Sequence, residues 1–288
     1  MGQQPKTLYV VCGPTAVGKT SHSIRLAQEL KTEVISADSR QLYREIPIGT
    51  AQPSVAELAS VKHHFIATRS VTEDYNAGMF GKDALSEIAT QFQHCDDLVM
   101  CGGTGLYIKA VVDGFDDLPK ANTEIRARIE EAYLKDGLDY LRSELERLDP
   151  THFSTCDLNN KQRLMRAIEV CLVTGKPYSE QRVGKKAKRD FDVQMIGLTM
   201  PREQLNERIN KRVDLMLKEG LLEEANAVHH LKHTNALQTL GYRELFDYFE
   251  EECTLDQAVE KIKINTRRFA KRQMTWFKRD NRIEWKEV

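Results

Sequence analysis

Residues 13–20 read Gly13-Pro14-Thr15-Ala16-Val17-Gly18-Lys19-Thr20, a complete G-x-x-x-x-G-K-[ST] pattern. The pattern stands between an apolar β-branched run, residues 7–12, and an amphipathic stretch with helical periodicity, residues 19–30. In a strand–loop–helix unit of this kind, glycines let backbone N–H groups converge on an anion at the helix N-terminus. Lys19 neutralises a terminal phosphate, and Thr20 offers its hydroxyl to Mg²⁺. We therefore predict that this loop binds a phosphate or diphosphate.

The rest of the chain places this loop in an α/β fold. Three further strand-like runs cover residues 33–36, 97–101 and 193–198, and helical patterns separate them. Continuous apolar strands joined through helices are typical of a parallel sheet that is covered on both faces. We expect a P-loop NTPase-like core with a mostly parallel sheet, formed by residues 1–115 and 191–288. Residues 116–190 show helical patterns only and predict an all-helical insertion domain.

Composition excludes several classes of protein. The 288 residues carry 42 Lys+Arg and 43 Asp+Glu, and no apolar run is long enough to span a membrane. The N-terminus lacks the pattern of a signal peptide. Six cysteines are widely spaced without a C-x-x-C pair, which indicates reduced thiols. We expect a cytoplasmic protein that has no membrane contact, is monomeric and needs no obligate protein partner.

The near-zero net charge hides two basic segments. Residues 161–189 hold 9 basic and 2 acidic side chains, and residues 261–288 hold 10 and 3. On the helix predicted from residue 161, basic side chains gather on one face, whereas the last helix shows an apolar stripe of Ile262, Phe269, Trp276 and Phe277. Such segments favour a polyanionic partner, although a solvated surface remains the alternative. For the last helix we favour contact with a phosphate backbone, with Lys271 and Arg272 as candidates.

The residues that follow two of the predicted strands limit the reactions that this protein could catalyse. An ATPase or GTPase usually carries an acidic residue at the end of a second apolar strand, but here residues 97–101 end in Met100-Cys101 and run into Gly102-Gly103-Thr104. Asp38 instead follows the strand of residues 33–36, at the edge where open α/β sheets bind ligands. A kinase for a small metabolite fits this position too, and a helix N-cap is the structural alternative for Asp38.

A further cation is predicted by periodicity. Arg212 falls within the apolar stripe of Leu205, Ile209 and Met216, and an arginine that faces a core must meet an anion. Either a buried salt bridge or a bound ligand would supply that anion. The histidine groups around residues 63 and 230 lack the spacing of a known metal site, so we do not expect histidine to ligate a metal.

Several motifs in order resemble those of the tRNA dimethylallyltransferase family, also called bacterial tRNA isopentenyltransferases. Besides the phosphate-binding loop, the matching motifs are Asp38-Ser39-Arg40-Gln41-Leu42-Tyr43, Ile48-Gly49-Thr50-Ala51, His63-His64, Gly102-Gly103-Thr104-Gly105-Leu106-Tyr107, Gln162-Arg163-Leu164-Met165-Arg166-Ala167-Ile168-Glu169 and Ala270-Lys271-Arg272-Gln273. The resemblance covers almost the whole chain. Val17 departs from it, because the family more often has a small polar residue there.

The resemblance implies transfer of a dimethylallyl group from dimethylallyl diphosphate to N6 of adenosine 37, 3′ of the anticodon in tRNA, releasing pyrophosphate. Residues 13–20 would hold the diphosphate, with Mg²⁺ on Thr20. The implied catalytic residues are Lys19, Asp38 as the base, Thr104 and Arg212. The implied tRNA contacts are Asp38, Ser39, Arg40, Gln41, Thr104, Arg126, Gln162, Arg163, Leu164, Met165 and Arg166, which bind the anticodon stem-loop. For Thr104, a helix N-cap is the structural alternative.

Three other functions stay open at this point: a small-metabolite kinase, an RNA-binding protein with a vestigial loop, and a prenyltransferase for free adenine nucleotides. A kinase has no use for two basic segments, and a pure RNA-binding protein has no use for an intact Lys19-Thr20 pair. A nucleotide prenyltransferase would not need the helical insertion.

Overall fold

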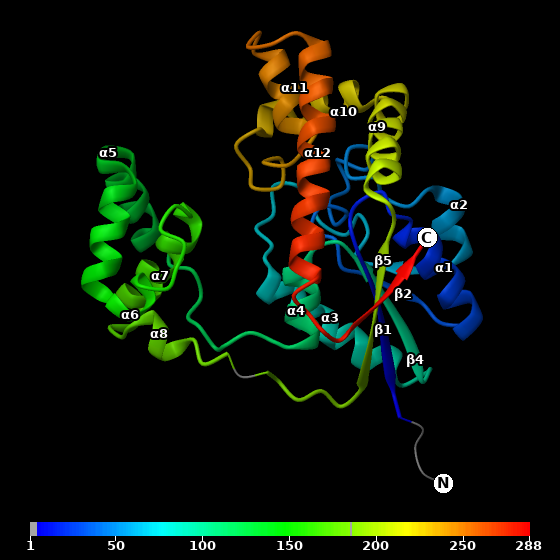
Figure 1. Cartoon of the computed structure of the whole chain (residues 1–288), viewed down its shortest axis with the longest axis horizontal. Coiled ribbons are helices and arrows are strands. Elements are labelled where there is room, and N and C mark those ends of the chain that lie inside the picture. Colours follow the sequence, from blue (N-terminus) through cyan, green and yellow to red (C-terminus); the bar gives the residue numbers. More distant parts are fainter. Residues whose placement is uncertain (1–4, 185) are drawn as a thin grey trace. The chain divides into compact units, whose positions relative to one another are not determined.

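The chain divides into two compact units. The structure is a computed structural model that describes residues 5–184 and 186–288. One unit takes in the chain up to Val112 together with Lys188–Val288, and the other is Asp113–Ala187. Figure 1 shows the elements of both units. From the sequence we expected a helical insertion at residues 116–190.

The larger unit is built on one parallel sheet. Its strand order is β3-β2-β4-β1-β5-β6, and every neighbouring pair is parallel. The strands are β1 (Thr7–Cys12), β2 (Val34–Ser36), β3 (His63–His64), β4 (Asp97–Gly102), β5 (Asp192–Thr199) and β6 (Ile283–Glu287). The sequence predicted the four inner strands. It missed β3 and β6, because one edge strand has two residues and the other is largely exposed, so neither shows a continuous apolar run.

Helices cover both faces of the sheet, which confirms the predicted α/β class. On one face, Leu8 and Met100 pack with Phe80 and Ile108 of helices α3 and α4. On the other face, Val11 and Val99 join a second cluster with helices α1 and α9. These helices are α1 (Lys19–Leu30), α3 (Ala77–Gln91), α4 (Gly105–Val112) and α9 (Arg202–Lys218). The short helix α2 (Val55–Ser60) precedes β3 and has no buried residue.

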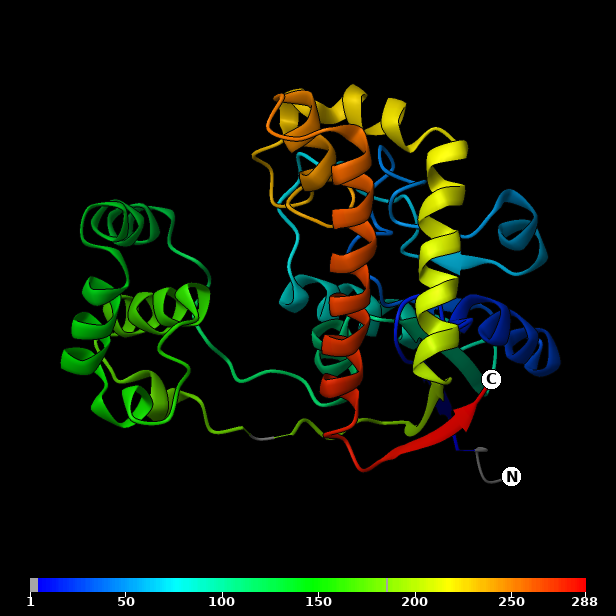
Figure 2. The ribbon, with the colours of Figure 1, turned by 45° about the horizontal axis from the view of Figure 1, so that its top comes forward.

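The remaining helices of the larger unit form a small helical layer with its own core. They are α10 (Leu221–Val228), the 3₁₀ helix η1 (His229–Leu231), α11 (Tyr242–Phe249) and α12 (Leu255–Phe277). Leu221, Leu237, Tyr242 and Ile262 are buried in this core. Figure 2 shows the long helices α9 and α12 side by side. A Thr254–Gln257 capping box starts α12, so the sequence itself marks where this helix begins.

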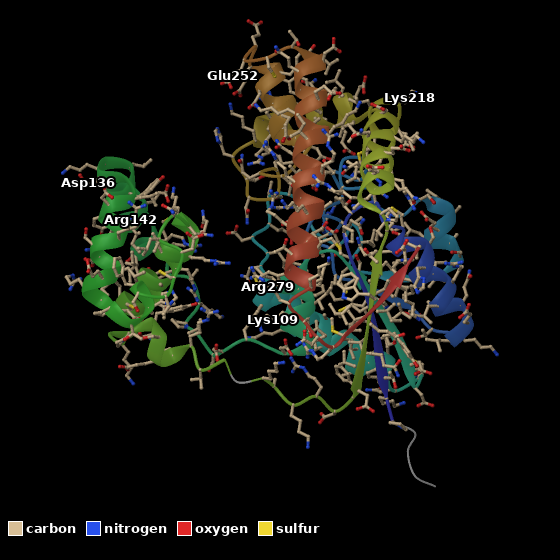
Figure 3. All side chains as sticks on the ribbon, in the orientation of Figure 1. Lys109, Asp136, Arg142, Lys218, Glu252 and Arg279 are labelled. Carbon is tan, nitrogen blue, oxygen red and sulfur yellow. The ribbon has the colours of Figure 1, made fainter. Side chains whose placement is uncertain are left out.

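The smaller unit is helical throughout its regular structure. It contains α5 (Thr123–Leu148), α6 (Pro150–Phe153), α7 (Lys161–Thr174) and α8 (Tyr178–Gln181). Gly137, at φ 68°, breaks α5 into two helical segments; Figure 3 labels Asp136 and Arg142 on either side of this break. Ile129, Leu145 and Leu164 lie in its apolar core. In the described part of the chain, no helix has both the length and the apolar character needed to cross a bilayer.

Candidate functional site

The phosphate-binding loop connects β1 to α1, as its sequence predicts. Gly18 stands at the N-cap of α1 with φ 104°, and Gly13 has φ 144°. A Cβ at Gly13 would lie 2.6 Å from the Leu198 carbonyl oxygen, so this glycine also allows the loop to pass close to β5. The Val17 side chain is fully buried in the core on the α1 side of the sheet. An apolar side chain therefore suits this position, although it departs from the family pattern.

Lys19 is held by the loop itself. Its Nζ donates to the carbonyl oxygens of Gly13 at 3.1 Å and Pro14 at 2.7 Å. Burial is the main cause that lowers the pKa of Lys19, and the nearby Asp38 carboxylate partly opposes this effect. The ammonium group has carbonyl partners but no carboxylate within hydrogen-bond distance among the described residues, so an arriving anion would stabilise its charge.

Asp38 lies in the turn that follows β2. Its Oδ1 accepts a hydrogen bond from the Arg40 backbone N–H at 3.0 Å, and the residues after it form turns, not a helix. The helix N-cap alternative for Asp38 is therefore wrong: the carboxylate closes a local Asx turn. Asp38 lies beyond the carboxyl end of β2, at the edge where open α/β sheets bind their ligands.

Thr104 lies beside that turn. Its hydroxyl accepts from the Ser39 N–H at 3.0 Å and lies 3.2 Å from Ser39 Oγ. The Thr104 backbone oxygen starts α4, but its hydroxyl pairs with the neighbouring turn, so a side-chain N-cap is not its role. Close packing brings the turns together, because a Cβ at Gly102 would lie 2.1 Å from the Ala37 oxygen.

Arg212 on α9 reaches the phosphate-binding loop. Its Nη1 donates to the Thr15 hydroxyl at 3.4 Å. Burial is the main cause that lowers the pKa of Arg212, followed by the nearby charge of Arg208. Within residues 5–184 and 186–288, no carboxylate forms an ion pair with Arg212, so the salt-bridge alternative does not account for its charge. The buried stripe of α9 contains Val213, whereas Met216 is only partly buried.

Lys19, Asp38 and Arg212 line one cleft of about 250 Å³, whereas Thr104 lies beyond the residues that line it. Residues of the loop, of the turn after β2, of the end of β4 and of α9 form the wall, together with side chains that the sequence did not single out. The polar side chains along its wall include Thr15, Lys19, Thr20, Ser36, Asp38, Gln41, Glu57, His63, Arg208, Arg212 and Gln273. Its size suits a small molecule, and the cations Lys19 and Arg212 favour an anionic one.

The cleft offers oxygen donors for a hard metal ion. Thr20 supplies a hydroxyl and Asp38 a carboxylate, which are donors that Mg²⁺ accepts. In the described ranges, no group of three or more His, Cys, Asp or Glu side chains is arranged to hold a metal. The residues thus fit an ion that takes most of its ligands from phosphate and water, not from the protein.

Comparison with known proteins identifies the family. The sequence model of the IPP transferase family matches residues 41–280. The chain belongs to the IPP transferase family. Over 277 residues it is 49% identical to the tRNA dimethylallyltransferase of Christiangramia forsetii, covering 96% of this chain and 92% of that protein. The corresponding enzyme of Flavobacterium johnsoniae is 48% identical, covering 97% and 93%. The resemblance noted in the sequence is confirmed.

Solved structures agree with this membership. The full-length tRNA isopentenylpyrophosphate transferase of Bacillus halodurans is 36% identical, with a TM-score of 0.72, covering 99% of this chain and 90% of that chain. A eukaryotic dimethylallyltransferase, solved acting on tRNA, is 26% identical with a TM-score of 0.83, covering 98% and 74%. Members of the IPP transferase family thus share this fold over nearly the whole chain.

Other family motif residues near the cleft hold the site together. Gln41 donates through Nε2 to the backbone oxygens of Thr50 and Ala51, so its amide fixes a wall of the cleft. Arg40 donates to the Asn235 oxygen at 2.9 Å. Burial is the main cause that lowers the pKa of Arg40. These contacts are compatible with a role in RNA binding, but each side chain already has a partner within the protein.

In the helical unit, two arginines that we predicted to contact tRNA are paired within the protein. Arg166 donates to the buried Glu169 at 2.9 Å and to the Pro119 oxygen at 2.6 Å, and Arg126 lies 3.6 Å from the same carboxylate. Gln162 and Arg163, on α7 with Arg166, are exposed.

The side chains that α7 buries differ from those that the sequence led us to expect. Leu164 and Met165 are buried, so their side chains serve the core and do not face a partner. Leu172, which helical spacing places on the apolar face with Leu164 and Ile168, is 40% exposed, whereas Glu169 is 1% exposed. The reason is that Glu169 meets two arginines and the Asn122 N–H, which compensate its burial.

The last helix also differs from its predicted stripe. Its buried residues are Ala258, Ile262, Ala270, Gln273 and Phe277, whereas Phe269 and Trp276 are more than one third exposed. Of the basic side chains, Lys263 pairs with Asp214 at 2.7 Å. Lys271 and Arg272 are exposed, and no acidic partner for either lies in the described residues. Arg279, labelled in Figure 3, lies two residues beyond the end of α12.

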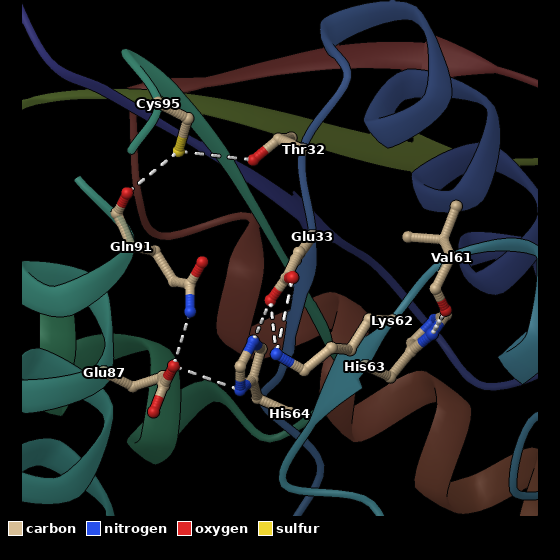
Figure 4. A network of polar contacts seen from close by, with 9 residues as sticks. All are labelled: Thr32, Glu33, Val61, Lys62, His63, His64, Glu87, Gln91 and Cys95. Carbon is tan, nitrogen blue, oxygen red and sulfur yellow. Dashed lines mark hydrogen bonds and ion pairs between the residues drawn. The ribbon is translucent and has the colours of Figure 1, made fainter. Parts of the chain in front are cut away.

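The histidine pair on β3 has two different environments, shown in Figure 4. His64 lies between two carboxylates, with Nε2 at 2.5 Å from Glu33 and Nδ1 at 3.2 Å from Glu87. His63 Nδ1 lies 2.8 Å from the Val61 oxygen, while its Nε2 is buried without a partner in the described structure. Burial is the main cause that lowers the pKa of His63, and this residue lines the cleft.

The sequence did not single out His63 or Gln273 as site residues. Both belong to motifs that match the family, and histidine ligation of a metal was not expected. The sequence does contain a signal for Gln273. It stands at helical spacing between Ala270 and Phe277, on the face of α12 that is buried. Such a residue needs hydrogen-bond partners inside the fold.

Proposed function

We propose that this protein transfers a dimethylallyl group from dimethylallyl diphosphate to N6 of adenosine 37 in tRNA, giving N6-(dimethylallyl)adenosine and pyrophosphate. The observation that carries the proposal is that Lys19 and Arg212, two cations without carboxylate partners in the described residues, line one cleft with Asp38. The family's named activity on tRNA supports the acceptor. A tRNA substrate also favours a cytoplasmic location.

The proposed reaction is a single exchange of bonds at one carbon. The bond from the allylic carbon to the diphosphate oxygen breaks, and a bond from that carbon to N6 forms. Lys19, Arg212 and the backbone N–H groups of the loop stabilise the charge that develops on the leaving diphosphate. The departing oxygen keeps the electron pair of the broken bond, so no oxidant or reductant is needed.

The acceptor nitrogen must also lose a proton. Asp38 is the proposed base: the adenine amino proton becomes acidic as the new C–N bond forms, so a carboxylate within hydrogen-bond reach suffices. Thr104 is proposed to orient the same amino group, since its hydroxyl lies at the neighbouring turn. The target base would have to leave its stack to reach these groups.

A divalent ion, proposed as Mg²⁺, would be held by the Thr20 hydroxyl together with oxygens of the diphosphate. Bound there, it would add charge neutralisation at the leaving group.

The residues proposed to contact RNA fall into three sets. In the larger unit, Ser39, Arg40 and Gln41 follow Asp38 in the turn after β2, and Lys271 and Arg272 are exposed on α12. In the smaller unit, Gln162 and Arg163 are exposed on α7. Exposed cations without acidic partners are available to phosphate groups, which dominate the affinity of proteins for nucleic acids. We propose the anticodon stem-loop as the bound element.

One assay tests the proposal against its alternatives. Radiolabelled dimethylallyl diphosphate is offered with bulk tRNA, with an anticodon stem-loop and with AMP. We expect label in tRNA and in the stem-loop, with ATP neither required nor converted to ADP. Efficient labelling of AMP would indicate a nucleotide prenyltransferase, and stoichiometric ADP release would indicate a kinase.

A further inference from the structure

Helix α12 buries an amide in the middle of its apolar face. Ala270 and Phe277 lie on the buried stripe, and between them Gln273 is only 7% exposed. A buried amide without partners destabilises the folded state, so the hydrogen bonds of Gln273 matter for folding. Leucine or methionine would fill the same space without that requirement.

Both ends of this amide bind backbone atoms of the candidate site. Gln273 Oε1 accepts from the Thr15 N–H at 2.8 Å, and Nε2 donates to the Gly103 carbonyl oxygen at 3.0 Å. Thr15 belongs to the phosphate-binding loop, and its hydroxyl is the partner of Arg212. Gly103 directly precedes Thr104. One side chain therefore joins the phosphate-binding loop, which is proposed to hold the diphosphate of the prenyl donor, to the turn of Thr104, which is proposed to orient the acceptor nitrogen.

The two hydrogen bonds of Gln273, here called the Gln273 bridge, lie in a closely packed region. A Cβ at Gly103 would lie 2.3 Å from Gln273 Nε2, and a Cβ at Gly105 would lie 2.1 Å from Trp276 Nε1. The glycine turn thus touches α12 at two points, on either side of Thr104. Because both glycines lack a side chain, the helix approaches the turn closely enough for the amide to span the gap.

We propose that Gln273 is a positioning residue for group transfer: it sets the spacing between the phosphate-binding loop and the Thr104 turn, and so between leaving group and acceptor. The inference rests on the proposed function. Both polar atoms of its side chain are engaged by the backbone, so the residue acts through Thr15 and Gly103 and not by contact with the reacting atoms.

Positioning has a kinetic signature. A misplacement of about 1 Å between reacting groups costs up to about 100-fold in rate. Gln273→Leu removes both hydrogen bonds at similar volume. We expect its single-turnover rate, at saturating dimethylallyl diphosphate and stem-loop, to fall roughly 30-fold or more, while both Michaelis constants stay within about 3-fold of wild type.

A second variant separates the two bonds. Gln273→Glu keeps an oxygen that accepts from the Thr15 N–H but loses the donor to the Gly103 oxygen. We expect it to be slow in transfer, because the link to the Thr104 turn is lost, and to bind dimethylallyl diphosphate less tightly than wild type, because the added carboxylate lines the same cleft as Lys19.

Gln257→Leu is the matched control on the same helix. Gln257 accepts from the Thr254 N–H in the capping box, away from the cleft. This variant is expected to lower the melting temperature without changing the rate. If Gln273→Leu likewise loses stability alone, the bridge is only structural and the inference is wrong. A raised Michaelis constant for the diphosphate with an intact rate would also overturn it.

A binding experiment tests the bridge without the reaction. On addition of inorganic pyrophosphate, the backbone amide NMR signals of Ser39 and Thr104 should shift in wild type and stay unchanged in Gln273→Leu, although both proteins bind the anion. Equal shifts in both proteins would contradict the bridge. If the wild-type protein fails to transfer the group, the proposed function fails, and this titration still decides whether the two loops are linked.

Discussion

The cations of the cleft and the arginines of the helical unit look alike in sequence but have different surroundings. Lys19 and Arg212 meet carbonyl and hydroxyl oxygens and have no carboxylate partner among the described residues. Arg166 and Arg126 instead share the buried Glu169. The first pair is arranged for an anion that arrives from outside, and the second pair compensates a charge that the fold itself buries. Substitutions should therefore separate the two pairs: loss of activity in the cleft and loss of stability in the helical unit.

The largest effect is expected in the phosphate-binding loop. Lys19→Ala should reduce transfer by at least ~100-fold, because it removes charge that stabilises the departing diphosphate. Thr20→Ala should act in the same direction. Steady-state transfer assays measure the loss, and circular dichroism should show unchanged folding. Near-normal turnover would contradict the assignment of this loop to the leaving group.

Arg212→Met tests the second cation of the cleft, which lies on α9. The Michaelis constant for dimethylallyl diphosphate should rise and the rate should fall, with the constant for tRNA unchanged. A protein that melts much lower but keeps normal donor kinetics would place Arg212 with the structural arginines instead.

Asp38→Asn should be nearly as severe but should leave binding intact. We expect the single-turnover rate to fall by roughly 100-fold, with affinity for tRNA and donor within a few fold of wild type, because a general base is lost while the Asx turn remains possible. Rapid-quench kinetics at saturation measures this rate. Collapse of tRNA binding with an intact rate would make Asp38 a positioning residue.

The arginines of α7 sharpen the comparison within one helix. Arg166→Ala leaves the buried Glu169 short of a partner and should destabilise the helical unit by on the order of 2 kcal/mol. Arg163→Ala, on the exposed face, should leave thermal stability unchanged and weaken tRNA binding. Urea unfolding and filter binding of both variants provide the test. Equal stability of the two variants would show that Glu169 does not depend on Arg166.

The smallest effect concerns the exposed cations of α12. Lys271→Ala/Arg272→Ala should flatten the salt dependence of tRNA binding by roughly one unit of slope for each phosphate that the protein no longer neutralises. Donor kinetics should not change. Lys263→Ala is the matched control, because Lys263 already pairs with Asp214. An unaltered slope in the double variant would make this face merely solvated.

Much of the fold followed from local patterns. The phosphate-binding loop, the four inner strands and the helical insertion are encoded by glycine positions, apolar runs and helical periodicity within short stretches. The turn carrying Asp38 and the turn carrying Thr104 were each recognisable as ends of strands. The predictions that failed concern which face of a helix is buried: on α7 and α12, Glu169 and Gln273 are inside, whereas Leu172 and Trp276 are not.

Periodicity cannot resolve such cases, because it assumes that polar side chains lie outside. A carboxylate or amide is buried only when partners from elsewhere in the chain meet it, and those partners have no local signature. Asn122 lies 47 positions from Glu169, and Thr15 lies 258 positions from Gln273. The sequence by itself determined the phosphate-binding loop, the parallel sheet and the family motifs, since each depends on residues close together in the chain. Only the tertiary structure decided which cations are left without an acidic partner and which amide joins the two sides of the cleft, because both depend on contacts between distant segments.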